Sequence, residues 1–209
     1  MRAMHGQHGI LQRRAWAILV IFFASLFFAS LPAFSSIDIQ LKKGSDREKQ
    51  TKIQLEKLLH TYDLKKWTVT ETIIIEEGAI PHSHPVLTLS TRHLDSDDEL
   101  LSTYVHEQFH WRLSQEREQT EAAVGELKKL YPKVPVGFPE GAISEESTYE
   151  HLIVCYFEMQ ADRALLGEAR TAELMKFWAG DHYRWVYRTI LQDEKKIAKI
   201  IHRNKLDLP

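Results

Sequence analysis

Two histidines and a glutamate lie within five residues of one another at a spacing that suits metal binding. His106 and His110 are four residues apart, so on a helix their rings project from one face, about one turn apart, and can bind one divalent ion. Glu107 lies at the edge of that face, where it can take a proton from a water molecule on the metal. Because the chain contains 11 histidines, chance alone can produce this spacing, and its surroundings must decide.

The surrounding residues predict the helix that this site needs. Ser96 and Glu99 form a capping box, a common helix start, and apolar residues then recur at helical spacing. His106 and His110 fall on the opposite face. They could be an ordinary hydrogen-bonded pair, but two imidazoles and an acid on a largely apolar helix each need a partner when buried, and a metal ion satisfies all three.

A second stretch, residues 149–167, predicts a helix that is apolar on nearly every side and therefore buried. It carries Glu158 and Asp162, four residues apart. Two buried carboxylates repel each other unless a positive charge lies nearby. A zinc ion beside Glu158 and a histidine or arginine beside Asp162 would account for them, and an ion pair with Arg163 or Arg112 is the alternative.

The HExxH motif followed by a helix with an ExxAD motif, here residues 158–162, resembles the gluzincin metallopeptidases. In that clan two histidines and a downstream glutamate bind a catalytic zinc ion. The resemblance implies that His106, His110 and Glu158 bind Zn²⁺ and that Asp162 orients one of the imidazoles.

The resemblance covers residues 96–167. Phe157 and Ala161 stand where the thermolysin-like branch has Asn and Ser, so the chain is more similar to a small gluzincin core than to that branch. The fold class that follows is α+β, a mainly helical, minigluzincin-like domain with a small antiparallel sheet next to the active-site helix.

His151 lies seven residues before Glu158 and hence on the same helical face. Three interpretations stay open for it. It could replace Glu158 as a ligand, donate a hydrogen bond to the substrate oxyanion, or be a buried histidine bonded to Glu150 or a backbone carbonyl.

Gluzincins also supply a His, Tyr or Arg from downstream sequence to stabilise the tetrahedral intermediate. His182, Tyr183 and Tyr187 are the candidates in this chain. Aromatic residues at this spacing are also typical of a helix core, which is the alternative for each.

Residues 67–75 and 85–90 are rich in β-branched and aromatic residues and predict two antiparallel strands joined by a turn. The second strand directly precedes the HExxH helix. A zinc peptidase would place there the edge strand that pairs with an extended substrate, and a plain structural hairpin explains the pattern equally well. His82 and His84 lie in the turn. They could line a metal cleft or be ordinary exposed loop histidines, which are common.

The N-terminal segment predicts export. Residues 15–34 contain no charge and follow Arg13 and Arg14, which is the layout of a signal sequence. Residues 1–35 are therefore a signal peptide or, if uncleaved, an N-terminal membrane anchor. In both cases the domain of residues 36–209 lies outside the cytoplasm, periplasmic, secreted or anchored.

Composition limits the partners. The net charge of -2 argues against nucleic acid, and the single cysteine excludes an intrachain disulfide. The sequence thus predicts a zinc-dependent peptidase that hydrolyses a peptide or protein substrate, with Glu107 as general base. The alternative is an exported or membrane-anchored, non-catalytic zinc-binding scaffold. Replacing Glu107 by Gln separates the two.

Overall fold

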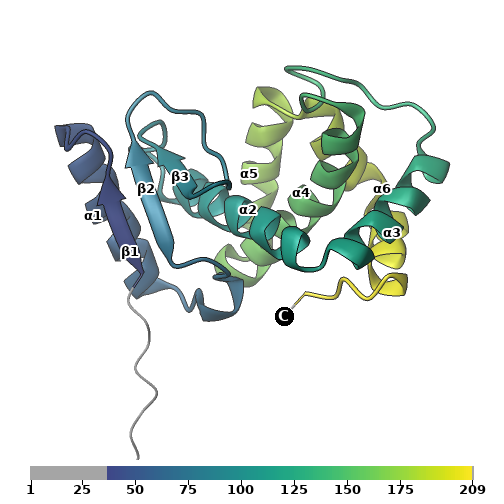
Figure 1. Cartoon of the computed structure of the whole chain (residues 1–209), viewed down its shortest axis with the longest axis horizontal. Helices are drawn as coiled ribbons and strands as arrows, with labels where there is room; N and C mark the ends of the chain where they lie inside the picture. Colours follow the sequence, from purple (N-terminus) through teal and green to yellow (C-terminus); the bar gives the residue numbers. More distant parts are fainter. Residues whose placement is uncertain (1–36, 209) are drawn as a thin grey trace, which may run out of the picture. The chain divides into compact units, whose positions relative to one another are not determined.

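The computed structural model describes residues 37–208, and a three-stranded sheet begins the fold (Figure 1). The strands are β1 (Asp38–Leu41), β2 (Thr72–Glu76) and β3 (Leu87–Ser90), in the order β1-β2-β3. Both pairs of neighbouring strands run parallel. The predicted antiparallel sheet is therefore wrong, and β1 was not predicted.

The segment that connects β2 to β3 explains why the antiparallel prediction was wrong. The chain turns at Gly78, whose φ of 83° favours glycine, and then runs back alongside the next strand. His82 exchanges two backbone hydrogen bonds with Thr88 in an antiparallel bridge, at 3.1 and 2.7 Å. The antiparallel neighbour of β3 is thus this short return segment, and β3 itself runs parallel to β2.

The first half of the predicted strand 67–75 does not join the sheet. Trp67 ends a 3₁₀ turn (Lys65–Trp67) and is buried against Phe109. The side chain of Gln108 accepts hydrogen bonds from the backbone N–H groups of Val69 and Thr70, both at 2.8 Å. A residue inside the HExxH motif therefore binds this segment to the helix in place of a strand partner.

Helix α1 (Asp46–Thr61) connects β1 to β2, as a parallel pair requires. Its predicted capping box is confirmed: Ser45 accepts from the backbone of Glu48, and the side chain of Glu48 reaches back to Ser45. The Glu48 carboxylate also accepts from the backbone N–H groups of Lys43, Gly44 and Glu77. It therefore ties the start of α1 to the ends of β1 and β2.

Five further helices make the fold mainly helical, which confirms the α+β prediction in its coarse form. They are α2 (Asp97–Gln115), α3 (Arg117–Leu130), α4 (Glu145–Leu166), α5 (Glu168–Asp181) and α6 (Arg184–Arg203). Helix α4 packs against α2, α3, α5 and α6, so it is buried on nearly every side, as its sequence predicts. It begins four residues earlier than predicted because Ser144 caps it.

Within residues 37–208 no helix combines the length and apolar character needed to cross a membrane. The predicted signal peptide or anchor, residues 1–35, lies outside the described residues.

Candidate metal centre

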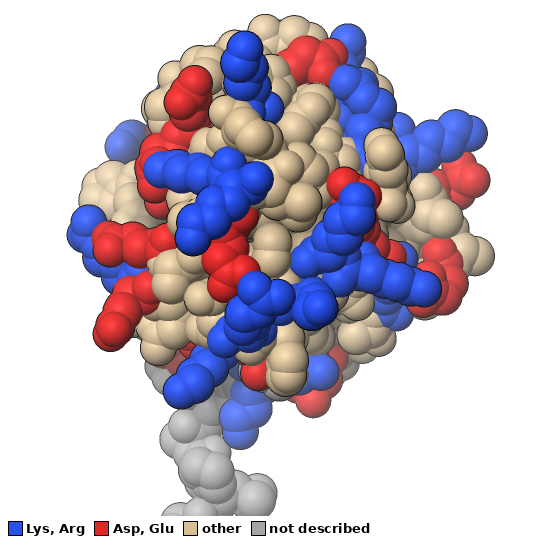
Figure 2. All heavy atoms as spheres, turned by 90° about the vertical axis from the view of Figure 1, so that its right-hand side faces the viewer, with Lys and Arg blue, Asp and Glu red and all other residues tan. Residues whose placement is uncertain are grey.

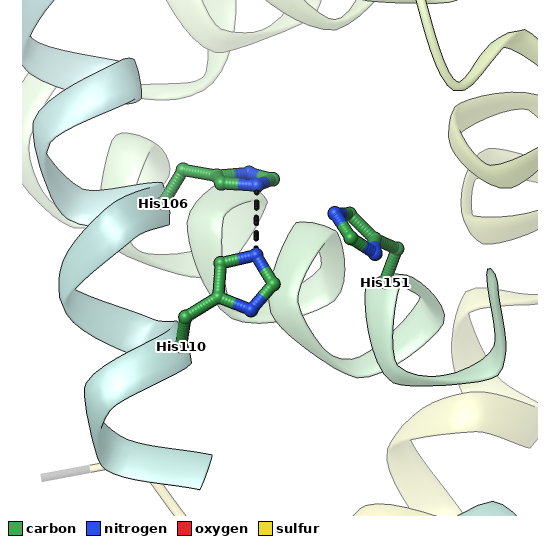
Figure 3. Close-up of side chains that lie close together, drawn as sticks. All are labelled: His106, His110 and His151. Carbon is green, nitrogen blue, oxygen red and sulfur yellow. Dashed lines mark hydrogen bonds between the residues drawn. The ribbon is translucent and has the colours of Figure 1, made fainter. Parts of the chain in front are cut away.

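Three histidine rings from two helices meet between α2 and α4. His106 and His110 project from α2 and His151 projects from the first turns of α4, and the rings face one another (Figure 3). One ring nitrogen of each lies within 4.8 Å of those of the other two. The Nε2 atoms of His106 and His110 are 3.3 Å apart. The predicted pairing of His106 and His110 is thus present, and His151 joins it.

Hydrogen-bond partners fix the tautomers of two of these rings. Nδ1 of His106 lies 2.7 Å from Oε2 of Glu158, and Nδ1 of His151 lies 2.6 Å from the carbonyl oxygen of Ser147. A carboxylate and a carbonyl accept hydrogen bonds, so both Nδ1 atoms carry the hydrogen. Both Nε2 atoms are then free to act as metal ligands.

Burial disfavours an additional proton on two of the three rings. Burial lowers the pKa of His151 to about 3 and that of His110 well below its usual value. Burial also acts to lower the pKa of His106, but contacts with Cys155 and Glu158 outweigh it and raise that pKa. A proton on His106 could bridge to His110 but would leave His151 without a partner. A divalent cation would satisfy all three rings, so the residues present fit a metal.

Glu158, the predicted third ligand, lies on the opposite side of the His106 ring from His110. Its carboxylate accepts from Nδ1 of His106, from the Ser102 hydroxyl at 2.7 Å and from the Tyr187 hydroxyl at 2.9 Å. A second grouping of His106, Cys155 and Glu158 also places three ligand atoms within 4.8 Å of one another. The ligand role of Glu158 therefore stays a prediction.

Asp162, predicted to orient an imidazole, is linked to Glu158 through the hydroxyl of Ser102. Ser102 Oγ is 2.7 Å from Glu158 and 2.8 Å from Asp162, and it accepts from Nε1 of Trp178 at 3.1 Å. A hydroxyl has one hydrogen, so it can donate to only one of the two carboxylates. Burial, followed by the charge of Glu158, raises the pKa of Asp162 well above its usual value. We therefore predict that Asp162 is the protonated carboxyl of the two and donates to Ser102.

Glu107, the predicted general base, is 5 % exposed. Burial raises its pKa to about 7, although the charges of His106 and His82 act in the opposite direction. A carboxyl group with a pKa near neutrality can both accept and return a proton at physiological pH.

Tyr183 lies against the histidine cluster. Its ring centroid is 4.2 Å from that of His151, and its ring is nearly parallel to that of His106 at 6.3 Å. It occupies the left-handed region with a φ of 47°, which is uncommon for a residue with a side chain. The following backbone N–H, of Arg184, donates to the carbonyl of Pro139, which fixes this turn beside the site.

His182 lies next to Tyr183, and a carboxylate orients its ring. Nδ1 of His182 is 2.7 Å from Asp181, whose other oxygen accepts from Arg92. Tyr187, the third downstream candidate, donates a hydrogen bond to Glu158, on the side of the His106 ring that faces away from His110. Sequence patterns gave no indication of Ser102 or Trp178, because a serine and a tryptophan on separate helices carry no recognisable spacing.

The loop histidines lie outside the cluster. His84 stacks on Trp111, with ring centroids 4.2 Å apart, and His82 pairs with Thr88 through the backbone. The backbone pairing of His82 with Thr88 occupies the edge of β3 at Thr88. From its sequence, this strand was one that could pair with an extended substrate.

Comparisons with protein-family models, with curated proteins and with solved structures found no match for this chain. The roles of the site residues therefore rest on the geometry described above.

Proposed function

We propose that this chain is a zinc-dependent hydrolase of peptide bonds. The observation that carries the proposal is the convergence of His106, His110 and His151, with nitrogens within 4.8 Å of one another and Glu107 buried on the same helix. Three protein ligands that leave a coordination position open are characteristic of catalytic rather than structural zinc.

The ligands in this proposal are the Nε2 atoms of the three histidines. Glu158 would instead hold the Nδ1–H of His106, as carboxylates commonly do behind a metal-binding histidine. Two observations support this assignment over ligation by Glu158. Its two oxygens are already engaged by His106, Ser102 and Tyr187, and His151 has its Nδ1 committed to a backbone carbonyl.

When bound, zinc would polarise the substrate carbonyl and make an attacking water molecule more acidic. Glu107 takes the proton of that water and passes it to the leaving amine, a transfer that its pKa of about 7 suits. Tyr183 lies over the rings of His151 and His106 and donates from its hydroxyl to the oxyanion of the tetrahedral intermediate. His182, oriented by Asp181, is the second candidate for that role.

We further propose that this activity takes place outside the cytoplasm. An uncharged segment, residues 15–34, follows two arginines, so the domain would be exported or held at the membrane outside the cytoplasm. The substrate would be a peptide or protein in that compartment.

The test compares bound zinc and peptide hydrolysis in matched variants. Glu107→Gln should retain zinc and lose hydrolysis of a mixed fluorogenic peptide library by about 10²-fold or more. His84→Ala, which changes a histidine outside the cluster, should retain both. If wild type binds zinc but hydrolyses no more than Glu107→Gln, the chain is the non-catalytic scaffold instead.

A further inference from the structure

A second feature lies on a different part of the molecule, where α3 and α6 pack against each other (Figure 1). A hollow of about 650 Å³ opens between these helices. Lys129 and Leu130 of α3 line it together with Lys196, Lys199 and Arg203 of α6. We refer to this hollow as the α3–α6 groove.

The groove is basic although the chain as a whole is acidic. Four Lys or Arg side chains and one acidic side chain, Glu126, line it, whereas the net charge of the chain is -2. Glu126 is already bound to Arg203 and Asn204. Figure 2 looks onto this side and shows many Lys and Arg side chains, interspersed with Asp and Glu side chains and uncharged surface.

The lysines of the groove are available to a partner. Within residues 37–208 neither Lys129 nor Lys199 has an ion-pair partner, and Lys196 pairs only with Asp193 of its own helix. An ion pair of that kind at the surface contributes little free energy. Leu130, 37 % exposed, adds an apolar contact between the charges.

The groove is separate from the metal centre. Helix α6 is interrupted at Asp193, which has non-helical backbone angles. The residues before this break include Tyr187, which binds Glu158, and the residues after it line the groove. The groove therefore lies on the part of α6 beyond the break, away from the turn at Tyr183. A ligand bound there would not occupy the candidate metal centre.

We propose that the α3–α6 groove binds an acidic polypeptide segment that carries at least one apolar side chain. The hollow is shallow and open to solvent, so a short peptide segment can lie along it with its carboxylates beside the lysines. Lysines act as point charges that suit carboxylates in many orientations. None of the described lining residues is aromatic, so nothing there would stack on nucleic acid bases. This inference does not depend on the proposed hydrolase activity.

The experiment measures binding of a fluorescent, Glu-rich peptide with a central Leu to the full-length protein by fluorescence anisotropy. Lys129→Glu/Lys199→Glu should weaken binding about tenfold or more, because two attractive charges become repulsive. Lys42→Glu/Lys176→Glu makes the same charge change at exposed positions outside the groove and should bind like wild type. Raising the salt concentration should weaken wild-type binding.

The neutral variant Lys129→Gln/Lys199→Gln should give an intermediate affinity, and circular dichroism should show that all variants are folded. Equal weakening in both charge-reversal variants would overturn the proposal, since only net charge would then matter. It would also fail if wild type did not bind the peptide. Binding of phosphatidylglycerol vesicles that depends on Lys129 and Lys199, without peptide binding, would make the groove a membrane contact and contradict it.

Discussion

Nδ1 of His106 donates to Oε2 of Glu158 across 2.7 Å, and the same ring presents Nε2 to His110 at 3.3 Å. The sequence alone could not separate the roles of Glu158 and His151. Under the proposed function, Glu158 would hold the His106 ring in place and His151 would complete the ligand set.

The first prediction concerns Glu158. Glu158→Gln should still bind zinc, with an affinity lowered about 10- to 100-fold, because an amide holds the His106 ring less strongly than a carboxylate. Competition with a coloured chelator measures this affinity. If Glu158 were a ligand, its loss would abolish binding as completely as His110→Ala does.

The second prediction concerns the proton on Asp162. An Asn side chain can donate to Ser102 as a protonated carboxyl does, so Asp162→Asn should change the free energy of unfolding by less than about 1 kcal/mol. Asp162→Ala removes the donor and leaves a gap, and should lower that free energy by about 1–3 kcal/mol. Urea unfolding of both variants measures the difference. Equal destabilisation would mean that Asp162 is ionised in the folded protein.

The third prediction concerns the effect of Glu48 on the free energy of unfolding at acidic pH. Burial acts to raise its pKa, but backbone hydrogen bonds from Glu77, Lys43, Gly44 and Ser45 together lower it below 4.5. The unfolded chain therefore binds the proton more readily, so the free energy of unfolding should fall as the pH drops below about 4.5 and the carboxylate is protonated. Above that range this contribution should be fully present.

Glu48→Gln tests this directly. The variant should be less stable by about 1–3 kcal/mol at neutral pH, because an amide leaves backbone donors without a full partner. Its stability should also decline less than that of wild type between pH 5 and pH 3. Urea unfolding across this range gives both quantities, and parallel pH profiles for the two proteins would show that Glu48 is not responsible.

The fourth prediction concerns Tyr183. Tyr183→Phe keeps the ring against His151 and removes only the hydroxyl, so zinc content should be unchanged. The turnover number should fall about 10²-fold with little change in KM, because the hydroxyl acts on the oxyanion of the transition state. Steady-state kinetics on one cleavable peptide separates the two. An increase in KM alone would assign Tyr183 to substrate binding.

Local signals predicted the elements that hold the site. A capping box at Ser45 and the N-cap side chain of Ser96 mark the starts of α1 and α2, and the four-residue spacing of His106 and His110 places their rings together. These features depend on a few adjacent residues, so the sequence contains them explicitly.

The sheet and the third ligand depend on contacts between distant segments. The parallel direction of β3 follows from the return segment at His82, which occupies its antiparallel side. His151 and Glu158 share one face of α4, so periodicity cannot rank them. Contacts of Glu158 with Ser102 and Tyr187, from two other helices, support our proposal that His151 is the third ligand.

The most direct test of the metal centre is zinc stoichiometry by elemental analysis of the purified protein after exposure to zinc and removal of excess metal. One zinc ion per chain is expected for wild type and for His84→Ala, and almost none for His106→Ala, His110→Ala and His151→Ala. Full zinc occupancy in a folded His151→Ala variant would contradict the three-histidine site.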